Sequence, residues 1–224
     1  MKAMILAAGR GERMRPLTDT TPKPLLKVGG RPLIEYHLEN IRRAGITDVV
    51  INHAWLGEQI ENSLGGGDRY GLNIQYSREG EALETAGGIQ KALPLLGEEP
   101  FIALNGDIWT DFSLSELPKE PTGLAHLVVV NNPSQHPEGD FMLQDGMLLP
   151  EGEHCLTFSG IGLYRPELFA GLKPGKAPLA PLLREALAKR QVSGEHHPGL
   201  WFDIGTPERL QALDEMLAQQ ASHG

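Results

Sequence analysis

The first half of the chain alternates short apolar runs with segments of helical period. Apolar runs predict strands over residues 2–7, 49–51, 72–76 and 101–104. Between them, helices are predicted over residues 32–44, 56–64 and 87–93. In the first of these helices Ile34, Leu38 and Ile41 fall on one face, as expected for an amphipathic helix that packs on a sheet. This β-α-β order predicts a parallel sheet with helices on both faces.

The second half of the chain has a mixed pattern. Strands are predicted over residues 124–130, 141–149 and 157–164, and helices over residues 179–189 and 208–218. Asp145-Gly146 interrupts the second of these strands and favours a two-residue hairpin turn. We therefore expect a single α/β domain with a nucleotide-binding half over residues 1–110. The mixed half, over residues 111–224, is expected to carry a small antiparallel flap.

Composition and charge exclude several classes of protein. The formal net charge of −9 and the lack of a basic run argue against binding to nucleic acid. No run of about 18 apolar residues exists, so we expect no membrane span. Cys155 is the single cysteine of the chain, so no intrachain disulfide can form, which is typical of a cytoplasmic protein. The sequence makes no prediction of the oligomeric state.

A glycine-rich loop follows the first predicted strand. Residues 6–16 read LAAGRGERMRP, and the glycines allow the backbone to turn tightly and direct amide protons at a phosphate. Arg10, Arg13 and Arg15 add three cations. Met14 stands where a dinucleotide-binding fingerprint needs a third glycine, which argues against a nicotinamide dehydrogenase. A lone glycine turn with solvated arginines is the alternative interpretation.

A lysine between two prolines strengthens the case for phosphate binding. Pro22 and Pro24 restrict the backbone on either side of Lys23. A lysine held in this way loses little further entropy when its ammonium group binds a phosphate. By itself Lys23 would be more typical of a rigid surface turn, but next to the glycine-rich loop it indicates a composite phosphate site.

Two aspartates far apart in sequence follow apolar runs. Asp107, in Asn105-Gly106-Asp107, lies at the carboxyl end of the strand over residues 101–104, where ligands bind in open parallel sheets. Asp203 follows the apolar pair Trp201-Phe202. Carboxylates suit Mg²⁺, which takes oxygen ligands and shares them with substrate phosphates. Each aspartate could also serve a local role, in a turn or before a helix.

These segments together resemble the signature of the sugar-1-phosphate nucleotidyltransferases. The motif continues through Pro-Leu-Thr at residues 16–18, Pro-Lys-Pro-Leu at 22–25, Asn-Gly-Asp at 105–107 and Trp-Phe-Asp-Ile-Gly-Thr-Pro at 201–207. The resemblance implies a Rossmann-like, mostly parallel mixed sheet with flanking helices, of the GT-A-like type. It also implies that Mg²⁺ is held by Asp107 and Asp203, and that Arg15 and Lys23 bind phosphate.

The expected site residues follow from the motifs. We expect Arg15, Lys23 and Asp107 to be catalytic. Nucleotide-binding roles are expected for Ala8, Gly9, Gly11, Glu12, Arg13, Lys23, Gly87, Gly88 and Asn105. In the family, the segment equivalent to residues 81–88 lies against the base, although a plain helix N-terminus would show the same pattern.

The sugar side of the site departs from the pattern of many relatives. Gly139 and Asp140 resemble the sugar-contacting segment, but a Glu-Lys-Pro motif found in relatives is absent. Glu151 is the expected sugar ligand at the corresponding place, with Glu153 left open as the alternative. The short chain resembles the compact uridylyltransferases of cell-wall recycling. This implies UTP and N-acetylmuramate α-1-phosphate as substrates, and the lactyl carboxylate of that sugar needs a cation or amide donors.

Two further functions stay open at the level of sequence. One is another member of the same family, namely a mannose-1-phosphate guanylyltransferase or a glucose-1-phosphate thymidylyl- or uridylyltransferase. The other is a non-catalytic sensor of nucleotide sugars on the same fold, since fold alone does not decide function. The joint presence of Arg15, Lys23, Asp107 and Asp203 favours catalysis.

Overall fold

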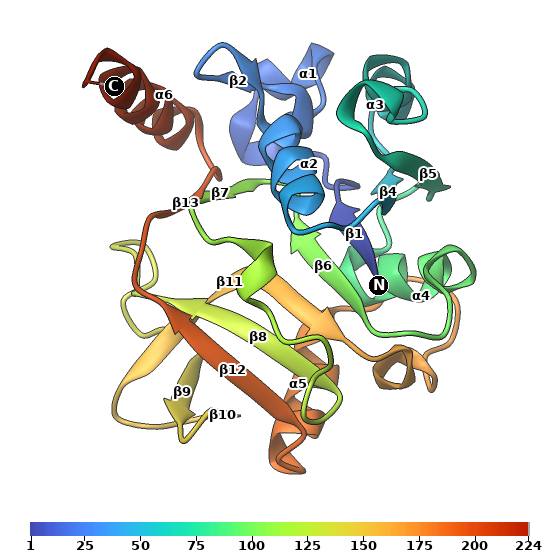
Figure 1. Ribbon diagram of the computed structural model, residues 1–224, viewed down its shortest axis with the longest axis vertical. Helices are drawn as coiled ribbons and strands as arrows, with labels where there is room; N and C mark the ends of the chain where they lie inside the picture. Colours follow the sequence, from blue (N-terminus) through green and yellow to red (C-terminus); the bar gives the residue numbers. More distant parts are fainter. Residues whose placement is uncertain (224) are drawn as a thin grey trace.

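A nine-stranded sheet runs through both halves of the chain (Figure 1). The computed structural model describes residues 1–223. The strand order is β5-β4-β1-β6-β11-β8-β12-β10-β9. The strands are β1 (Lys2–Leu6), β4 (Asp48–His53), β5 (Asn73–Arg78), β6 (Phe101–Asn105), β8 (Ala125–Val130), β9 (Phe141–Gln144), β10 (Met147–Leu149), β11 (Cys155–Tyr164) and β12 (Val192–His197). Two-stranded ladders join β2 (Lys27–Val28) to β3 (Arg31–Pro32), and β7 (Ile108–Thr110) to β13 (Trp201–Asp203).

The first four strands of the main sheet form the parallel part that the sequence predicts. β1 pairs in parallel with β4 and with β6, and β4 pairs in parallel with β5. β11 then lies antiparallel between β6 and β8. The carboxyl ends of β1, β4 and β6 therefore meet at one edge of the sheet, which is where parallel sheets bind ligands.

The far end of the sheet closes into a ring of strands. β12 pairs with both β8 and β10, and β9 pairs with both β10 and β11. The predicted hairpin is present, with its turn at Asp145 (φ 51°) and Gly146 (φ 76°). Positive φ at both central residues is the type I′ geometry that Asp-Gly favours. The antiparallel flap expected from sequence is thus built into the main sheet.

Helices cover both faces of the sheet (Figure 1). The longer helices are α2 (Leu33–Arg43), α3 (Gly57–Leu64), α4 (Glu84–Leu96), α5 (Leu179–Ala188) and α6 (Pro207–His223), with a short α1 (Leu17–Thr20) after the glycine-rich loop. Successive residues of β1 serve opposite faces: Ala3 and Ile5 pack with α2 and α3, whereas Met4 packs with α4 and α5. This alternation is the period of two that a strand imposes on its side chains.

A third apolar cluster joins the end of the chain to the glycine-rich loop. Met14, Trp109, Ile204 and Leu213 are buried in it, so α6 packs over the segment that carries the loop. Trp109 and Phe202 meet edge to face, with ring centroids 6.0 Å apart. The packing fixes the position of Asp203, because the residues on both sides of it, Phe202 and Ile204, belong to this cluster.

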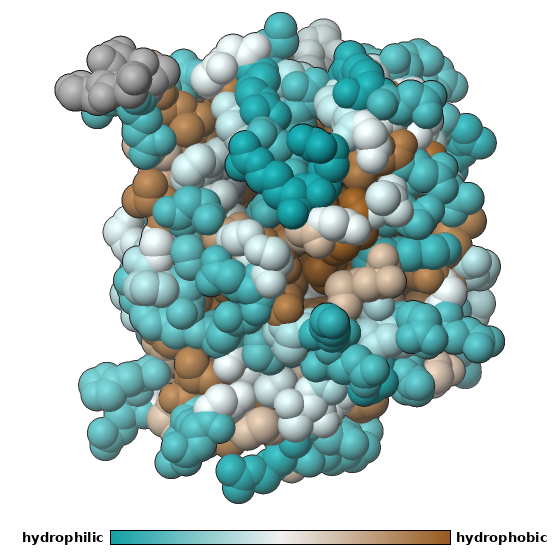
Figure 2. All heavy atoms as spheres, viewed as in Figure 1, coloured by the Kyte–Doolittle hydropathy of each residue, from teal (hydrophilic) through white to brown (hydrophobic). Residues whose placement is uncertain are grey.

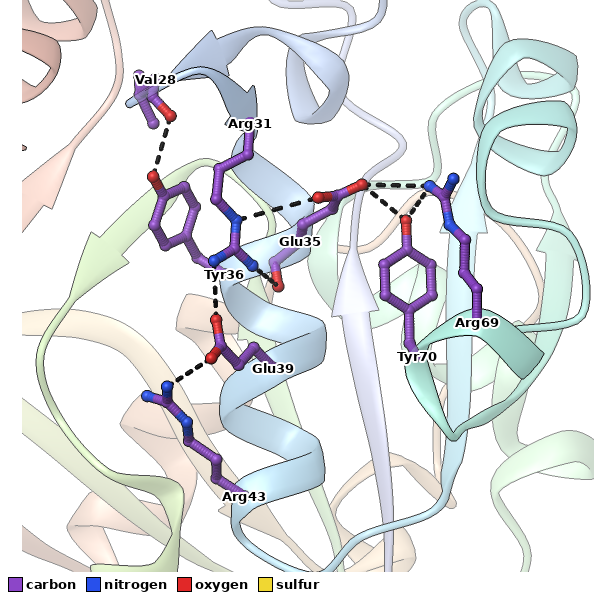
Figure 3. Close-up of polar contacts among 8 residues, drawn as sticks. All are labelled: Val28, Arg31, Glu35, Tyr36, Glu39, Arg43, Arg69 and Tyr70. Carbon is purple, nitrogen blue, oxygen red and sulfur yellow. Dashed lines mark hydrogen bonds and ion pairs between the residues drawn. The ribbon is translucent and has the colours of Figure 1, made fainter.

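The exposed side of α2 carries a network of ion pairs (Figure 3). Arg31 lies between Glu35 and Glu39, with Nη1 2.8 Å from Glu39 Oε2. Glu35 also accepts hydrogen bonds from Tyr70 and Arg69 of the turn before β5. Exposed pairs of this kind contribute about 0–1 kcal/mol each. We therefore expect the network to help orient α2 rather than to supply a large share of the stability of the fold.

The helices and one face of the surface can be compared with the needs of a bilayer span. Within residues 1–223, no helix has both the length and the apolar character to cross a bilayer. Figure 2 shows a face that is mostly hydrophilic or intermediate, with apolar atoms most visible in the middle of the face, below α2. Most large apolar side chains of the described residues are buried, and Met1, Leu17, Trp55 and Leu200 are exposed.

Candidate functional site

Two cavities adjoin one another at the carboxyl edge of the parallel strands. The first cavity, of about 370 Å³, is lined by Leu6, Ala7, Ala8, Gly9, Lys23, Pro24, Asn52, Ala82, Glu84, Thr85, Asn105, Gly106 and Asp107. The second cavity, of about 270 Å³, is lined by Asn105, Asp107, Ile108, Pro133, Gln135, His136, Thr157, Phe158, Ser159, Trp201 and Asp203. Asn105 and Asp107 form part of both walls. A ligand in one cavity therefore touches the same two side chains as a ligand in the other.

The structure brings the two predicted metal ligands, Asp107 and Asp203, into one wall. β7 and β13 run antiparallel with Asp203 opposite Ile108, and the amide of Ile204 donates to the carbonyl of Asp107 at 2.9 Å (Figure 1). Both aspartate side chains line the second cavity. A two-stranded ladder thus brings together two residues that are far apart in sequence. The apolar pair before Asp203 was the only sign of this ladder in the sequence.

Lys23 lines the first cavity next to Asp107, which both cavities share. Its side chain is 10% exposed, and Nζ donates to Asp107 Oδ2 at 2.7 Å. The flanking Pro24 is also buried and lines the first cavity with it. The buried ammonium of Lys23 is thus paired with the carboxylate that lines both cavities.

Asp203 has a partner that the sequence analysis missed. Arg209, in the first turns of α6, donates from Nη1 to Asp203 Oδ2 at 2.6 Å. A β-carbon at Gly205 would lie 2.8 Å from Arg209 Nη1 and 3.3 Å from Arg13 Nη2, so two guanidinium groups crowd the glycine after Asp203. The sequence carried one signal for this pair: Arg209 follows Asp203 by six residues, across the start of a predicted helix. A side chain in the first turns of a helix can reach back toward the residues before the helix.

The glycine-rich loop is only partly in the cavity wall. Ala8 and Gly9 line the first cavity as expected, whereas Gly11, Glu12, Arg13 and Arg15 are absent from the lining of both cavities. Gly11 has φ 69°, and a β-carbon there would lie 2.9 Å from Thr18 Cγ2. Its role in the structure is the turn itself, which only glycine adopts without strain.

Arg15 is held away from the cavities by an aspartate. Its side chain is 57% exposed, and Nε donates to Asp19 Oδ1 at 2.8 Å. Arg10 donates to the same oxygen at 2.9 Å and stacks on Trp55 at 3.8 Å from the ring centroid. The hydrogen bond from Arg10, followed by that from Arg15, lowers the pKa of Asp19. Both arginines are thus bound to one carboxylate outside the first cavity.

A buried polar bridge links two walls of the first cavity. The amide of Ala7 donates to Asn52 Oδ1 at 2.9 Å, and Asn52 Nδ2 donates to Glu79 Oε1 at 2.6 Å. Glu79 Oε2 in turn accepts from the amide of Leu83 at 2.8 Å. Sequence reasoning missed Asn52 and Glu79. Asn52 could have been predicted from sequence, because it is a polar residue at the carboxyl end of an apolar strand.

Gly87 and Gly88 are packing residues rather than parts of the cavity wall. A β-carbon at Gly87 would lie 2.2 Å from the carbonyl oxygen of Gly175, and one at Gly88 would lie 2.6 Å from Glu79 Oε1. Both glycines let α4 approach its neighbours closely. The residue of this segment that does face the first cavity is Glu84, which has φ 61° at the start of α4. A non-glycine residue in this region costs about 1–2 kcal/mol.

The predicted sugar ligands occupy different places. Gly139 (φ 68°) forms a turn, where a β-carbon would lie 2.7 Å from the carbonyl oxygen of Cys155. Asp140 does not line the second cavity, but its Oδ1 lies 3.1 Å from Nε2 of His136, which does. Glu151 and Glu153 are exposed on the loop between β10 and β11, outside the lining of both cavities. Phe158 and Trp201 supply the flat apolar faces in the second cavity.

His37 is a buried histidine directly behind this wall. Its ring, on α2, lies against the backbone of Gly106 and Ile108 on either side of Asp107. Among the described residues, Nε2 of His37 is the one buried side-chain nitrogen or oxygen without a hydrogen-bond partner. Burial lowers its pKa to about 4, an effect larger than the opposing attraction of Asp107.

Acid is therefore expected to destabilise the fold through His37. An unfolded histidine takes up a proton near pH 6.5, whereas the folded side chain does so near pH 4, so the unfolded state binds more protons in between. The free energy of unfolding should fall by about 2–3 kcal/mol from about pH 7.5 to about pH 4.5 through this group. Urea titrations of wild type and His37→Leu measure it. An identical pH dependence in both proteins would contradict the assignment.

With the geometry in place, comparison with known proteins identifies the family. The family model described as nucleotidyl transferase matches residues 2–141, and the chain belongs to this family. The N-acetylmuramate alpha-1-phosphate uridylyltransferase of Neisseria meningitidis serogroup B is 56% identical over 94% of this chain and 96% of its own length. The protein of the same name from Caulobacter vibrioides is 33% identical over 97% of each chain. The resemblance to sugar-1-phosphate nucleotidyltransferases is thereby confirmed.

A solved structure confirms the fold class. A structure from Bacillus anthracis, described as a glucose-1-phosphate thymidylyltransferase in complex with sucrose, superimposes with a TM-score of 0.86. It covers 97% of this chain and 95% of its own, at 23% sequence identity. The chain therefore shares the α/β fold of that structure, with its mixed sheet.

Proposed function

We propose that the protein transfers UMP from UTP to N-acetylmuramate α-1-phosphate, giving UDP-N-acetylmuramate and pyrophosphate. The observation that carries this proposal is the 56% identity, over 94% of the chain, to a protein named for that activity. Two adjoining cavities that share Asp107 support it, because the reaction needs two substrates to meet at one phosphorus atom. N-acetylmuramate is a peptidoglycan sugar, so we place the reaction in cell-wall recycling in the cytoplasm, where UTP is made.

The chemistry needs no nucleophilic or basic side chain. An ionised oxygen of the sugar phosphate forms a bond to the α-phosphorus of UTP, and the bond from that phosphorus to the bridging oxygen of pyrophosphate breaks. The barrier comes from bringing polyanions together and from the charge that develops on the leaving group, so positioning and charge stabilisation supply the catalysis. Lys23 lines the first cavity next to the shared Asp107 and would neutralise the α-phosphate.

The first cavity suits the nucleotide. Ala8 and Gly9 place loop backbone along its wall, and Thr85 and Asn105 add polar groups. The second cavity suits the sugar, since Phe158 and Trp201 offer apolar faces for its C–H groups. The indole of Trp201 is fixed by a hydrogen bond from Nε1 to the carbonyl of Ser159 at 2.9 Å.

The carboxylates of Asp107 and Asp203 fit a magnesium ion. Each carboxylate uses Oδ2 for its ion pair, with Lys23 or Arg209, and both face one cavity. Across residues 1–223 no group of three or more His, Cys, Asp or Glu side chains could hold a metal, so the ion would complete its shell with substrate oxygens, as Mg²⁺ commonly does. When bound, Mg²⁺ would supply charge neutralisation at the phosphates.

Removal of magnesium is expected to stop the reaction. After treatment with EDTA, pyrophosphate release should fall to background and return when Mg²⁺ is added. Asp203→Asn should raise the Mg²⁺ concentration required for half-maximal rate, because the amide is a weaker ligand than the carboxylate. Undiminished turnover by chelated enzyme with metal-free substrates would rule out the magnesium site.

A matrix of substrates tests the proposed function. Pyrophosphate release is measured with each of four nucleoside triphosphates against the 1-phosphates of N-acetylmuramate, N-acetylglucosamine, glucose and mannose. UTP with N-acetylmuramate α-1-phosphate is expected to give the highest kcat/KM. A preference for GTP with mannose 1-phosphate, or for a thymidine nucleotide with glucose 1-phosphate, would replace the proposal by another family activity. Tight nucleotide binding without any release would favour a sensor.

A further inference from the structure

We infer that His136 selects the acidic sugar by binding the carboxylate of its lactyl group, an inference that rests on the proposed function. N-acetylmuramate differs from N-acetylglucosamine by a lactyl ether on O3, which ends in a carboxylate. Discrimination between the two sugars therefore requires a donor for that carboxylate in the sugar cavity. His136 lines the second cavity, and its side chain is 39% exposed, so it is reachable from the cavity.

Several polar side chains of the second cavity are already engaged, whereas Asn105 and Gln135 carry uncharged amides. Thr157 donates its hydroxyl to Asn132 Oδ1 at 2.9 Å, and Trp201 donates its indole N–H to Ser159. Asp107 and Asp203 repel an anion and are paired with Lys23 and Arg209. No lysine or arginine occurs in the described lining of this cavity. His136 is thus the side chain of that lining that can present a positive charge.

A neighbouring carboxylate fixes the orientation of the imidazole. Asp140 Oδ2 accepts from the amide of Phe158 at 2.8 Å, which anchors Asp140 to β11, and its Oδ1 lies 3.1 Å from Nε2 of His136. In an imidazolium both ring nitrogens donate. Nε2 then serves Asp140, and Nδ1, for which the structure shows no partner within residues 1–223, serves the lactyl carboxylate. Asp140 is accordingly a positioning residue, which accounts for its place next to the cavity rather than in its wall.

The loop that carries His136 is separate from the catalytic wall. Residues 131–140 connect β8 to β9, whereas Asp107 and Asp203 come from the ladder of β7 and β13. A carboxylate bound at His136 is thus held by a different part of the chain from the one that holds the phosphates. This arrangement lets the loop set the choice of sugar without changing the groups that surround the reacting phosphorus.

The test compares His136→Ala with a matched control, His154→Ala. His154 is an exposed histidine outside the lining of both cavities. We expect His136→Ala to raise KM for N-acetylmuramate α-1-phosphate at least about tenfold, the lower range for loss of a charge-assisted hydrogen bond. The KM for UTP should change little, and His154→Ala should resemble wild type. His136→Arg, which restores a cation, should recover most of the affinity.

A neutral sugar separates the specific role from a structural one. N-acetylglucosamine 1-phosphate is measured as a substrate or, if it is not turned over, as a competitive inhibitor. Its KM or Ki should change far less than KM for the acidic sugar in His136→Ala. Equal losses for both sugars, or no loss for the acidic one, would overturn the role of His136. Failure of the proposed function would show differently, as a wild-type enzyme that prefers another sugar phosphate.

Discussion

Asp107→Asn is expected to lower kcat for UMP transfer at least about a hundredfold, by analogy with removal of one electrostatic stabiliser from an active site. The substitution keeps the size of the side chain and removes its charge at the place shared by both cavities. It also removes the acceptor of the ion pair with Lys23 and one carboxylate of the proposed magnesium site. The measurement is steady-state pyrophosphate release at saturating UTP and sugar phosphate.

The control for Asp107→Asn is the same chemical change at Asp145. Asp145 is exposed in the type I′ turn, where asparagine tolerates the positive φ of 51°. Asp145→Asn should therefore retain wild-type turnover. Circular dichroism and thermal melting establish that both variants are folded. A folded Asp107→Asn enzyme with near wild-type kcat would remove Asp107 from the catalytic assignment.

Lys23→Met is expected to cause a loss of similar size, at least about a hundredfold in kcat. Methionine keeps an unbranched side chain at this buried position between Pro22 and Pro24, but it carries no charge. Because Asp107 is 42% exposed, water can solvate its carboxylate after the change, and stability should suffer little. Lys27→Met, at an exposed position on β2, is the matched control and should leave turnover unchanged.

A double variant shows how Lys23 acts. If Lys23 stabilises charge on the substrates directly, its loss should add to that of Asp107→Asn in the double variant. If Lys23 acts only by holding Asp107, the double variant should be no slower than Asp107→Asn alone, since residues that act through one another are not additive. We expect the larger, added loss. Full turnover in Lys23→Met would refute both roles.

The parallel part of the fold could be predicted from sequence because its pattern is local. β1, β4, β5 and β6 are apolar runs separated by helices with clear period, and the structure has all of them. The Asp145-Gly146 turn could also be predicted from sequence, since a dipeptide determines its geometry. The position of β11 between β6 and β8 could not be predicted from sequence, because strand order depends on packing of the whole chain.

One strand of the nine-stranded sheet was not predicted, for a reason visible in its side chains. β12 contains Ser193, Gly194, Glu195 and two histidines in six residues, so it has no apolar alternation. It forms because β8 and β10 pair with it on both sides. His196 and His197 bond singly to Asn131 and Asp111.

The site was predictable where a motif fixes the backbone and less so where side chains choose partners. Ala8, Gly9, Lys23, Asn105, Asp107 and Asp203 all line the cavities, each at a strand end or in a rigid turn. The phosphate-binding role of Arg15 stays a prediction, and in the structure its long side chain bonds to Asp19. Asn52 and Arg209 left local signals in the sequence, whereas Glu79 is placed by contacts with Asn52 and with the amide of Leu83 that follow from the fold.

The shared wall of the two cavities also bears on how the enzyme can be blocked. Asn105 and Asp107 line both spaces, so the nucleotide and the sugar phosphate proposed to bind there would lie on either side of the same two side chains. A single bisubstrate inhibitor, with a uridine joined to an acidic amino sugar through a short phosphate mimic, can therefore occupy both spaces at once. Because one molecule loses its translational freedom once rather than twice, such a compound gains affinity over the separate halves.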